Sequence, residues 1–120
     1  MRLFGKRPSN LESSGNPDDD MTLQAIVKQG GDLTKPRHWV HYLYFTDEQT
    51  ARAAAAQINE GGWDLQTVDE AAVGDGSWVV IPERHDVVVD PAAVRLAREF
   101  FEGVVTGVPG AEYDGWEVSL

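Results

Sequence analysis

Three histidines are the side chains in this sequence best suited to acid–base or metal chemistry. They are His38, His41 and His85, and the chain has no cysteine, which excludes thiol catalysis and cysteine-ligated zinc. His38 and His41 are three residues apart in a segment with strand character. Because successive strand side chains alternate between faces, these two histidines project to opposite faces and cannot share one ion. We therefore predict no metal site.

A carboxylate pair and a lone histidine are the remaining candidates for catalysis. Glu112 and Asp114 share one face of a predicted strand, about 7 Å apart by the strand rise, but the sequence guarantees no apolar surroundings for them. We interpret them as solvated acids. His85 lies beside Glu83 and Asp86, but no serine stands in a recognisable nucleophile motif. No glycine-rich phosphate loop with its lysine is present. We predict no catalytic residue and no cofactor.

The charge of the chain is strongly negative and unevenly placed. The net charge is −10; residues 1–37 hold six Lys/Arg against five acids, and residues 38–120 hold four against fifteen. An acidic surface repels the phosphate backbone, so direct binding of nucleic acid is not expected. A basic protein partner fits better. The alternative is that the acidity only keeps the protein in solution.

Periodicity and breaker residues predict the elements that must position these side chains. Thr46 and Gln49 form a capping-box pattern, and Asp90 followed by Pro91 is typical of a helix start. In order, we predict a disordered lead-in at 1–17, a short helix within 18–29, a loop to 36, a strand at 37–45, a helix over 46–60, strands at 63–68 and 77–82, a helix over 90–106 and a final strand at 110–120.

The order from residue 37 onward predicts an α+β, ferredoxin-like βαββαβ sandwich. This arrangement has a four-stranded antiparallel sheet with two helices on one face, with strands 37–45 and 77–82 in the centre. The short N-terminal helix and its loop, residues 18–36, precede that core, residues 37–120. Together they make a single domain over 18–120, which suits a chain of this length.

One face of that sheet is left without the two main helices, and we expect it to be rich in aromatic residues. We assign Trp39, Leu43, Phe45, Val79 and Ile81 to the helix side, and Val40, Tyr42, Tyr44, Trp78, Val80 and Trp116 to the open side, while Tyr113 packs under the helices. So large an apolar surface requires a cover, either the helix within 18–29 or a partner. The partner-binding residues we predict are Tyr42, Tyr44, Trp78, Glu112, Asp114 and Trp116.

Two blocks of sequence resemble a known family. They are Asp32-Leu33-Thr34-Lys35-Pro36-Arg37, leading into His41-Tyr42-Leu43-Tyr44-Phe45, and Gly110-Ala111-Glu112-Tyr113-Asp114-Gly115-Trp116. From about residue 20 onward the chain is similar to the regulator of ribonuclease E activity B (RraB) family. That resemblance implies a ferredoxin-like domain that binds ribonuclease E and modulates RNA cleavage without catalysis of its own. The N-terminal helix and the lack of a long acidic tail depart from the best-known members.

The leading hypothesis is a non-catalytic, protein-binding regulator whose partner is ribonuclease E or a related RNA-processing protein. One alternative is a small-molecule-binding domain or enzyme that uses the aromatic open face. Another is a stand-alone domain that forms a homodimer through that face. An RNA-recognition module is disfavoured because strand 77–82 lacks the basic, glycine-rich signature of such domains. The chain has no signal-peptide pattern and no apolar run long enough to span a membrane, so we expect a cytoplasmic protein.

Overall fold

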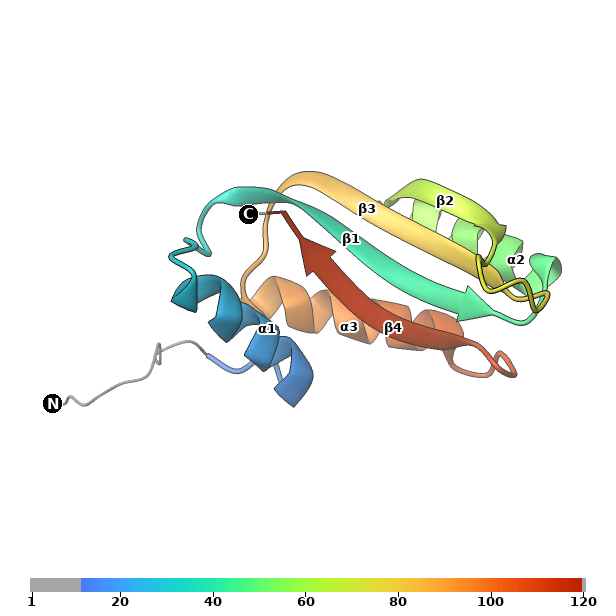
Figure 1. Ribbon diagram of the computed structural model, residues 1–120, viewed down its shortest axis with the longest axis horizontal. Helices are drawn as coiled ribbons and strands as arrows, with labels where there is room; N and C mark the ends of the chain where they lie inside the picture. The colour runs from blue at the N-terminus through green and yellow to red at the C-terminus, as the bar shows by residue number, and fades with distance from the viewer. Residues whose placement is uncertain (1–11, 120) are drawn as a thin grey trace, which may run out of the picture.

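The structure is a computed structural model that describes residues 12–119 (Figure 1). The predicted lead-in of residues 1–17 therefore lies mostly outside the described residues. Within the described range, three helices and four strands follow in the order α1 (Pro17–Lys28), β1 (Pro36–Phe45), α2 (Glu48–Glu60), β2 (Asp64–Glu70), β3 (Trp78–Val88), α3 (Pro91–Val105) and β4 (Glu112–Val118).

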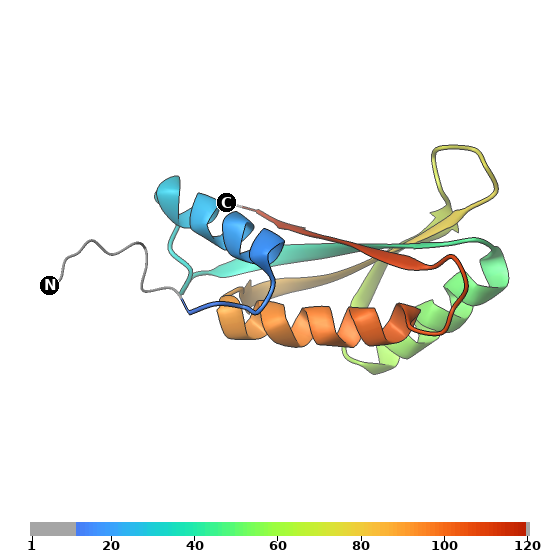
Figure 2. The same ribbon diagram turned by 90° about the horizontal axis from the view of Figure 1, so that it is seen from below.

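The four strands form one antiparallel sheet in the order β2-β3-β1-β4. The predicted placement of β1 and β3 in the centre, with β4 beside β1, is confirmed. Helices α2 and α3 both lie on one side of this sheet, as Figure 2 shows. The α+β class and the four-stranded antiparallel sheet are therefore as expected from the element order. The other side of the sheet, here called the open face, carries neither of these two helices.

Short acidic and amide side chains begin the helices. Asp90 accepts a hydrogen bond from the amide of Ala93 at 2.9 Å, and Pro91 occupies the first turn, so the predicted start of α3 is confirmed. The start of α2 is shifted by one residue. Its cap is Asp47, which accepts from the amide of Thr50 at 2.9 Å, and not Thr46. Both residues are good caps, and the extended backbone at Asp47 selects it.

The core lies between the sheet and its helices. Trp39, Leu43 and Phe45 of β1 are buried there, as predicted, and they pack with Ile58 of α2 and Phe101 of α3. Alanines of α2 let its backbone approach the sheet closely; Ala51, Ala54 and Ala55 are all buried. The strand residues that point towards the helices are therefore held in place by packing in this core.

The prediction for the faces of β3 is wrong. Val80 is fully buried opposite Leu43, and the guanidinium of Arg52 on α2 lies 5.2 Å from the centre of the Trp78 ring. Trp78 and Val80 thus face the helices, and Val79 and Ile81 lie on the open face. Residues 78–81 are apolar throughout, so their pattern does not distinguish the two faces. The register with β1 decides it, because paired residues share a face.

Strand β3 continues well past the predicted end at residue 82. Pro82 is buried opposite Leu65, and the ladder to β2 shifts register between Leu65 and Thr67. A proline has no amide hydrogen to give to a central ladder, so an irregularity in the neighbouring strand accommodates it. The residues after Pro82 therefore extend the strand to Val88.

A bulge in β4 reverses the predicted direction of Trp116. Leu43 pairs with Tyr113 but Tyr42 pairs with Gly115, so one extra residue, Asp114, is inserted on β4. Gly115 has a φ of 109°, a conformation that other residues rarely adopt. Because of the insertion, Tyr113 and Trp116 lie on the same face, and that face is the helix side. The prediction that Trp116 lies on the open face is wrong.

Replacing Gly115 with alanine should lower the free energy of unfolding by about 1–3 kcal/mol. A Cβ atom at this position would meet no heavy atom within 4 Å, so the expected loss comes from the backbone conformation alone. Urea unfolding followed by tryptophan fluorescence measures it. Gly103→Ala in α3 is the matched control, since a Cβ there also meets nothing, and it should leave stability unchanged or raise it by up to about 1 kcal/mol. Equal stability of the two variants would contradict the bulge.

Helix α1 does not cover the open face. Leu23 joins the core cluster, and α1 packs beside α3 at the β4 edge of the sheet (Figure 2). The turn before it is held by Ser14, whose amide and hydroxyl both donate to Asp20, at 2.8 and 2.7 Å. The idea of the N-terminal helix as a lid over the aromatic face is therefore wrong.

Candidate partner-binding face

The open face presents an apolar and aromatic stripe along the two central strands. Tyr42 and Tyr44 of β1 and Val79 and Ile81 of β3 are only partly buried, and Val40 is buried between its neighbours. Among the described elements, no helix lies across this stripe (Figures 1 and 2). A depression of about 290 Å³ opens at one end of the stripe, beside His38, Tyr42 and Glu117.

Carboxylates on the two outer strands border this stripe. On β4, Glu112 lies opposite Tyr44 and Glu117 opposite Val40; on β2, Asp69 lies opposite Val79. The hydroxyl of Tyr42 donates a hydrogen bond to Glu117. That bond to a carboxylate, together with some burial, raises the pKa of Tyr42 to about 12. The open face therefore has tyrosine rings with their hydroxyl groups at its centre and carboxylates along both borders.

Four of the six predicted partner-binding residues are placed on this side of the sheet or at its edge. Tyr42, Tyr44 and Glu112 belong to the open face, and Asp114 is exposed in the β4 bulge. Trp78 and Trp116 do not belong to it, because both pack against the core on the helix side. Glu117 and Asp69 are not identified by the sequence alone, since only the strand register shows which acids border the tyrosines.

In a second group, where β1 begins and β3 ends, two histidine side chains lie against one carboxylate. Oε1 of Glu83 is 2.7 Å from Nε2 of His38 and 3.4 Å from Nε2 of His85, and the two rings stack with centroids 4.2 Å apart. The ladder slips here, between Arg37 and Trp39, and Asp86 has a φ of 57°. This irregularity brings His85 against His38. No sequence pattern marks this irregularity, so the cluster could not be predicted from the sequence.

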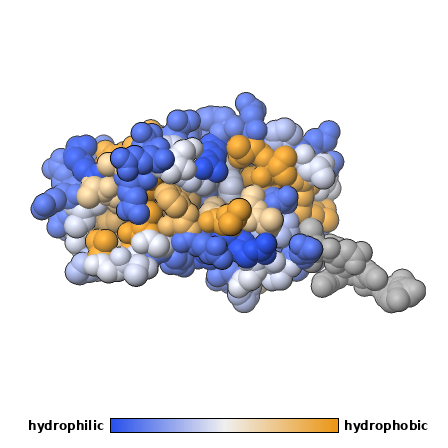
Figure 3. Space-filling model, turned by 180° about the vertical axis from the view of Figure 1, so that it is seen from behind, coloured by the Kyte–Doolittle hydropathy of each residue, from blue (hydrophilic) through white to orange (hydrophobic). Residues whose placement is uncertain are grey.

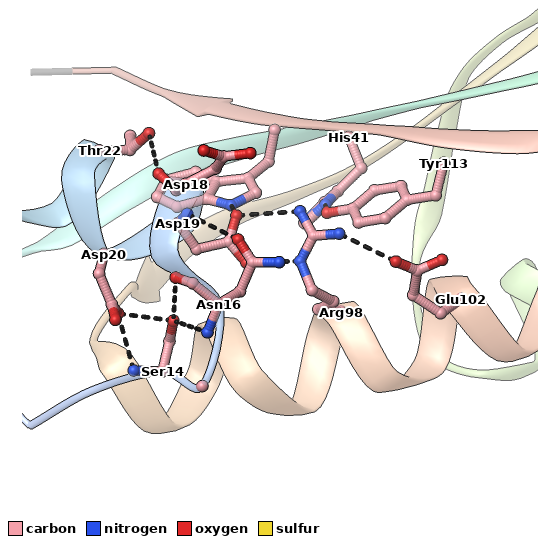
Figure 4. Close-up of polar contacts among 12 residues, drawn as sticks. Ser14, Asn16, Asp18, Asp19, Asp20, Thr22, His41, Arg98, Glu102 and Tyr113 are labelled. Carbon is pink, nitrogen blue, oxygen red and sulfur yellow. Dashed lines mark hydrogen bonds and ion pairs between the residues drawn. The ribbon is translucent and has the colours of Figure 1, made fainter.

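A buried ion pair fixes α1 to the rest of the domain (Figure 4). Asp19 is only 4 % exposed, and its carboxylate receives two hydrogen bonds from Arg98 of α3, at 2.6 and 3.0 Å. The indole of Trp116 donates a third bond to the same carboxylate at 2.8 Å. Arg98 also bonds Glu102 at 3.0 Å. Three elements, α1, α3 and β4, thus meet at one carboxylate.

His41 lies beside this ion pair, fully buried in an aromatic cage. Its ring centre is 4.5 to 4.8 Å from those of Phe101, Trp39 and Trp63, and Nδ1 is 2.7 Å from the hydroxyl of Tyr113 (Figure 4). Burial, with the positive charges of Arg84 and Arg98, holds the pKa of His41 well below its usual value of 6.5. Nε2 has no hydrogen-bond partner among the described residues. His41 is therefore a neutral, structural histidine on the opposite face from His38.

The helix side carries an apolar groove of its own. It has a volume of about 420 Å³ between the end of α2, β3 and α3, and its lining includes Trp63, Arg84, Leu96 and Phe100. Leu96 is 66 % exposed, and Figure 3, drawn from this side, shows apolar residues gathered among hydrophilic ones. The guanidinium of Arg84 lies 3.8 Å from the centre of the Trp63 ring. Substitutions in this groove can therefore serve as controls for substitutions on the open face.

The sequence matches the family model described as "Regulator of ribonuclease activity B" over residues 16–118. The chain belongs to this family. The match to the RraB family begins before α1, so this helix is part of the family's domain. The expectation that the N-terminal helix departs from the family is therefore wrong. A search among curated proteins finds no match. No helix in the described part of the chain is long and apolar enough to cross a membrane.

Proposed function

We propose that this RraB-family chain is a non-catalytic regulator that binds a ribonuclease of the ribonuclease E type, or a related RNA-processing protein, through its open sheet face. The observation that carries the proposal is the uncovered pair of tyrosines, Tyr42 and Tyr44, between acids on both outer strands. The family description, which names regulation of ribonuclease activity, supplies the class of partner. On this proposal the chain acts by contact with the partner protein and carries out no reaction of its own.

The charge of this surface favours a basic partner segment. Glu112 and Glu117 border one side of the tyrosines and Asp69 the other, within a chain of net charge −10. Arginine and lysine side chains of an extended segment could pair with these acids while their aliphatic parts cover the tyrosine rings. Complementary charge of this kind speeds encounter and fixes orientation. We propose four of the residues predicted from the sequence as contact residues: Tyr42, Tyr44, Glu112 and Asp114. To these we add Glu117 and Asp69, which the strand register places on the same face.

The same border of acids counts against a homodimer through this face. Two copies placed face to face would bring their acids together, which costs several kcal/mol for close like charges. It also counts against direct nucleic-acid binding, for the same electrostatic reason. The small-molecule or enzyme alternative has less support, because the depression beside Tyr42 is open at the surface and His41 is buried on the other side.

The decisive experiment measures binding of the purified chain to purified ribonuclease E from the same source, in parallel with RNA cleavage. Tyr44→Ala should weaken binding by about tenfold or more, as expected for an aromatic contact near the centre of an interface. The double substitution Glu112→Lys, Asp69→Lys should slow association and reduce its dependence on salt. Both variants should lose their effect on RNA cleavage in step with the loss of binding.

Matched controls lie on the helix side. Leu96→Ala removes an exposed apolar side chain there, and Glu60→Lys with Glu99→Lys changes the net charge by the same amount as the open-face double variant. These controls should bind as the natural chain does. Binding that survives the open-face substitutions but fails in the helix-side controls would overturn the choice of face. Absence of any binding to ribonuclease E would overturn the choice of partner.

A further inference from the structure

Glu83, His38 and His85 form a set of three metal-ligand groups on the open face. One imidazole nitrogen from each histidine and one carboxylate oxygen all lie within 4.8 Å of one another. Two imidazoles and one carboxylate are a common ligand set for zinc and related ions. We propose that these three side chains bind one divalent transition-metal ion of the zinc class. The inference does not rest on the proposed function.

The surroundings of Glu83 favour a cation. Its Oε1 atom lies against both histidine side chains, 2.7 Å from Nε2 of His38 and 3.4 Å from Nε2 of His85. Gln66 donates a further hydrogen bond to the same oxygen at 3.3 Å, which helps to hold the carboxylate in place. Asp64 lies opposite Glu83 in the ladder and adds negative charge nearby. A positive ion is therefore favoured at this position.

The backbone fixes two of the ligands, and the third can adjust. His38 and Glu83 come from the paired central strands, whereas His85 precedes the irregularity at Asp86 and its side chain is 58 % exposed. The two rings are parallel within 3° and stacked, so their nitrogen lone pairs lie in two separate parallel planes. A shared ion requires one ring to turn, and rotation about the outer side-chain bond of His85 is a soft motion. Metal–nitrogen bonds of about 2.0–2.1 Å set the final geometry.

The ligand types indicate which ions would bind. Imidazole nitrogens favour zinc, cobalt, nickel and copper over calcium and magnesium, which take oxygen ligands almost exclusively. Three protein ligands leave a fourth position for water or for a side chain of a bound protein. The set lies beside the depression of about 290 Å³ that reaches His38 and Glu117. An ion here would lie at the end of the tyrosine stripe.

Titration of the purified, metal-free chain with cobalt(II) and zinc(II) at neutral pH tests the inference. We expect saturable binding of one ion per chain, visible absorption bands of four-coordinate cobalt, and displacement of cobalt by zinc. His38→Ala, His85→Ala and Glu83→Gln should each weaken binding by at least about tenfold, because loss of a ligand exceeds the 10–100-fold effect of losing an outer-shell partner. Calcium and magnesium should not compete.

Two controls separate this site from general attraction of cations to an acidic surface. Glu117→Gln removes an acid from the same face outside the set and should leave the cobalt spectrum unchanged. In nuclear magnetic resonance spectra, cobalt should broaden the ring signals of His38 and His85 strongly, and those of His41, buried on the other side of the sheet, less. Binding of equal strength in the variant lacking both His38 and His85, or absence of saturable binding, would overturn the proposal. Circular dichroism confirms that each variant is folded.

Discussion

Replacing Asp19 with alanine is expected to lower the free energy of unfolding by about 3 kcal/mol, the largest effect that we predict for a single substitution. The carboxylate is buried and accepts three hydrogen bonds, two from Arg98 and one from Trp116. Its removal leaves the indole N–H and two nitrogens of a largely buried guanidinium without their partner, and Arg98 keeps only its bond to the exposed Glu102. A buried charge that loses its counter-ion costs far more than the intact pair contributes.

A double-mutant cycle distinguishes the ion pair from simple packing. Asp19→Leu combined with Arg98→Met replaces both charges by apolar groups and should be clearly more stable than Asp19→Leu alone. Trp116→Phe removes the indole donor together with part of the ring system and should cost at least about 1 kcal/mol. Urea midpoints are measured for the natural chain, Asp19→Leu alone, Arg98→Met alone, the double variant and Trp116→Phe. If the double variant is as unstable as the sum of the two single variants, the pair carries no coupling and α1 is held by apolar contacts such as Leu23 instead.

Stability should fall as the pH is lowered from 7.5 to 5, and His41 should contribute to that loss. The pKa of His41 in the folded protein is well below 6.5 because of burial and the charges of Arg84 and Arg98. The unfolded chain takes up a proton near pH 6.5, whereas the folded chain does not. Below pH 6.5 the free energy of unfolding therefore falls by about 1.4 kcal/mol per pH unit, until the pH reaches the pKa of His41 in the folded protein.

His41→Gln provides the control for this dependence. Glutamine can still bond the hydroxyl of Tyr113 but cannot take up a proton, so the variant should be less sensitive to pH between 6.5 and 5. Acids whose pKa is lowered by local hydrogen bonds, such as Asp20, Asp47 and Asp75, lose their contribution only as the pH falls below about 5. The same slope in both proteins would show that folding does not change the pKa of His41.

The fold followed from the sequence to a large extent because its signals are local. Asp90 and Pro91 start α3 by their own hydrogen-bonding chemistry, and the aromatic run at 37–45 forms β1 with its odd-numbered residues buried. The strand order then follows from the alternation of strands and helices. The family resemblance, carried by the residues around Tyr113 and Trp116, is confirmed by a match over residues 16–118.

The candidate site was harder to predict because it depends on register. Val80 faces the helices because it pairs with Leu43, and Trp116 joins Tyr113 on that side because Asp114 is an extra residue in β4. A shift of one residue exchanges the two faces of a strand, and the amino-acid composition does not indicate where such a shift occurs. Tyr42 and Tyr44 kept their predicted place because β1 is regular across that stretch.

The class of fold, the order of the strands, the acidity and the family of this protein could all be predicted from residue types and short-range spacing. Three features become visible only in the folded chain. They are the acids that border Tyr42 and Tyr44, the place of Glu83 between His38 and His85, and the binding of Asp19 by Arg98. Asp19 and Arg98 are far apart in the chain, and His38 meets His85 only through an irregular ladder. Contacts of this kind arise from packing and register, which no local pattern specifies.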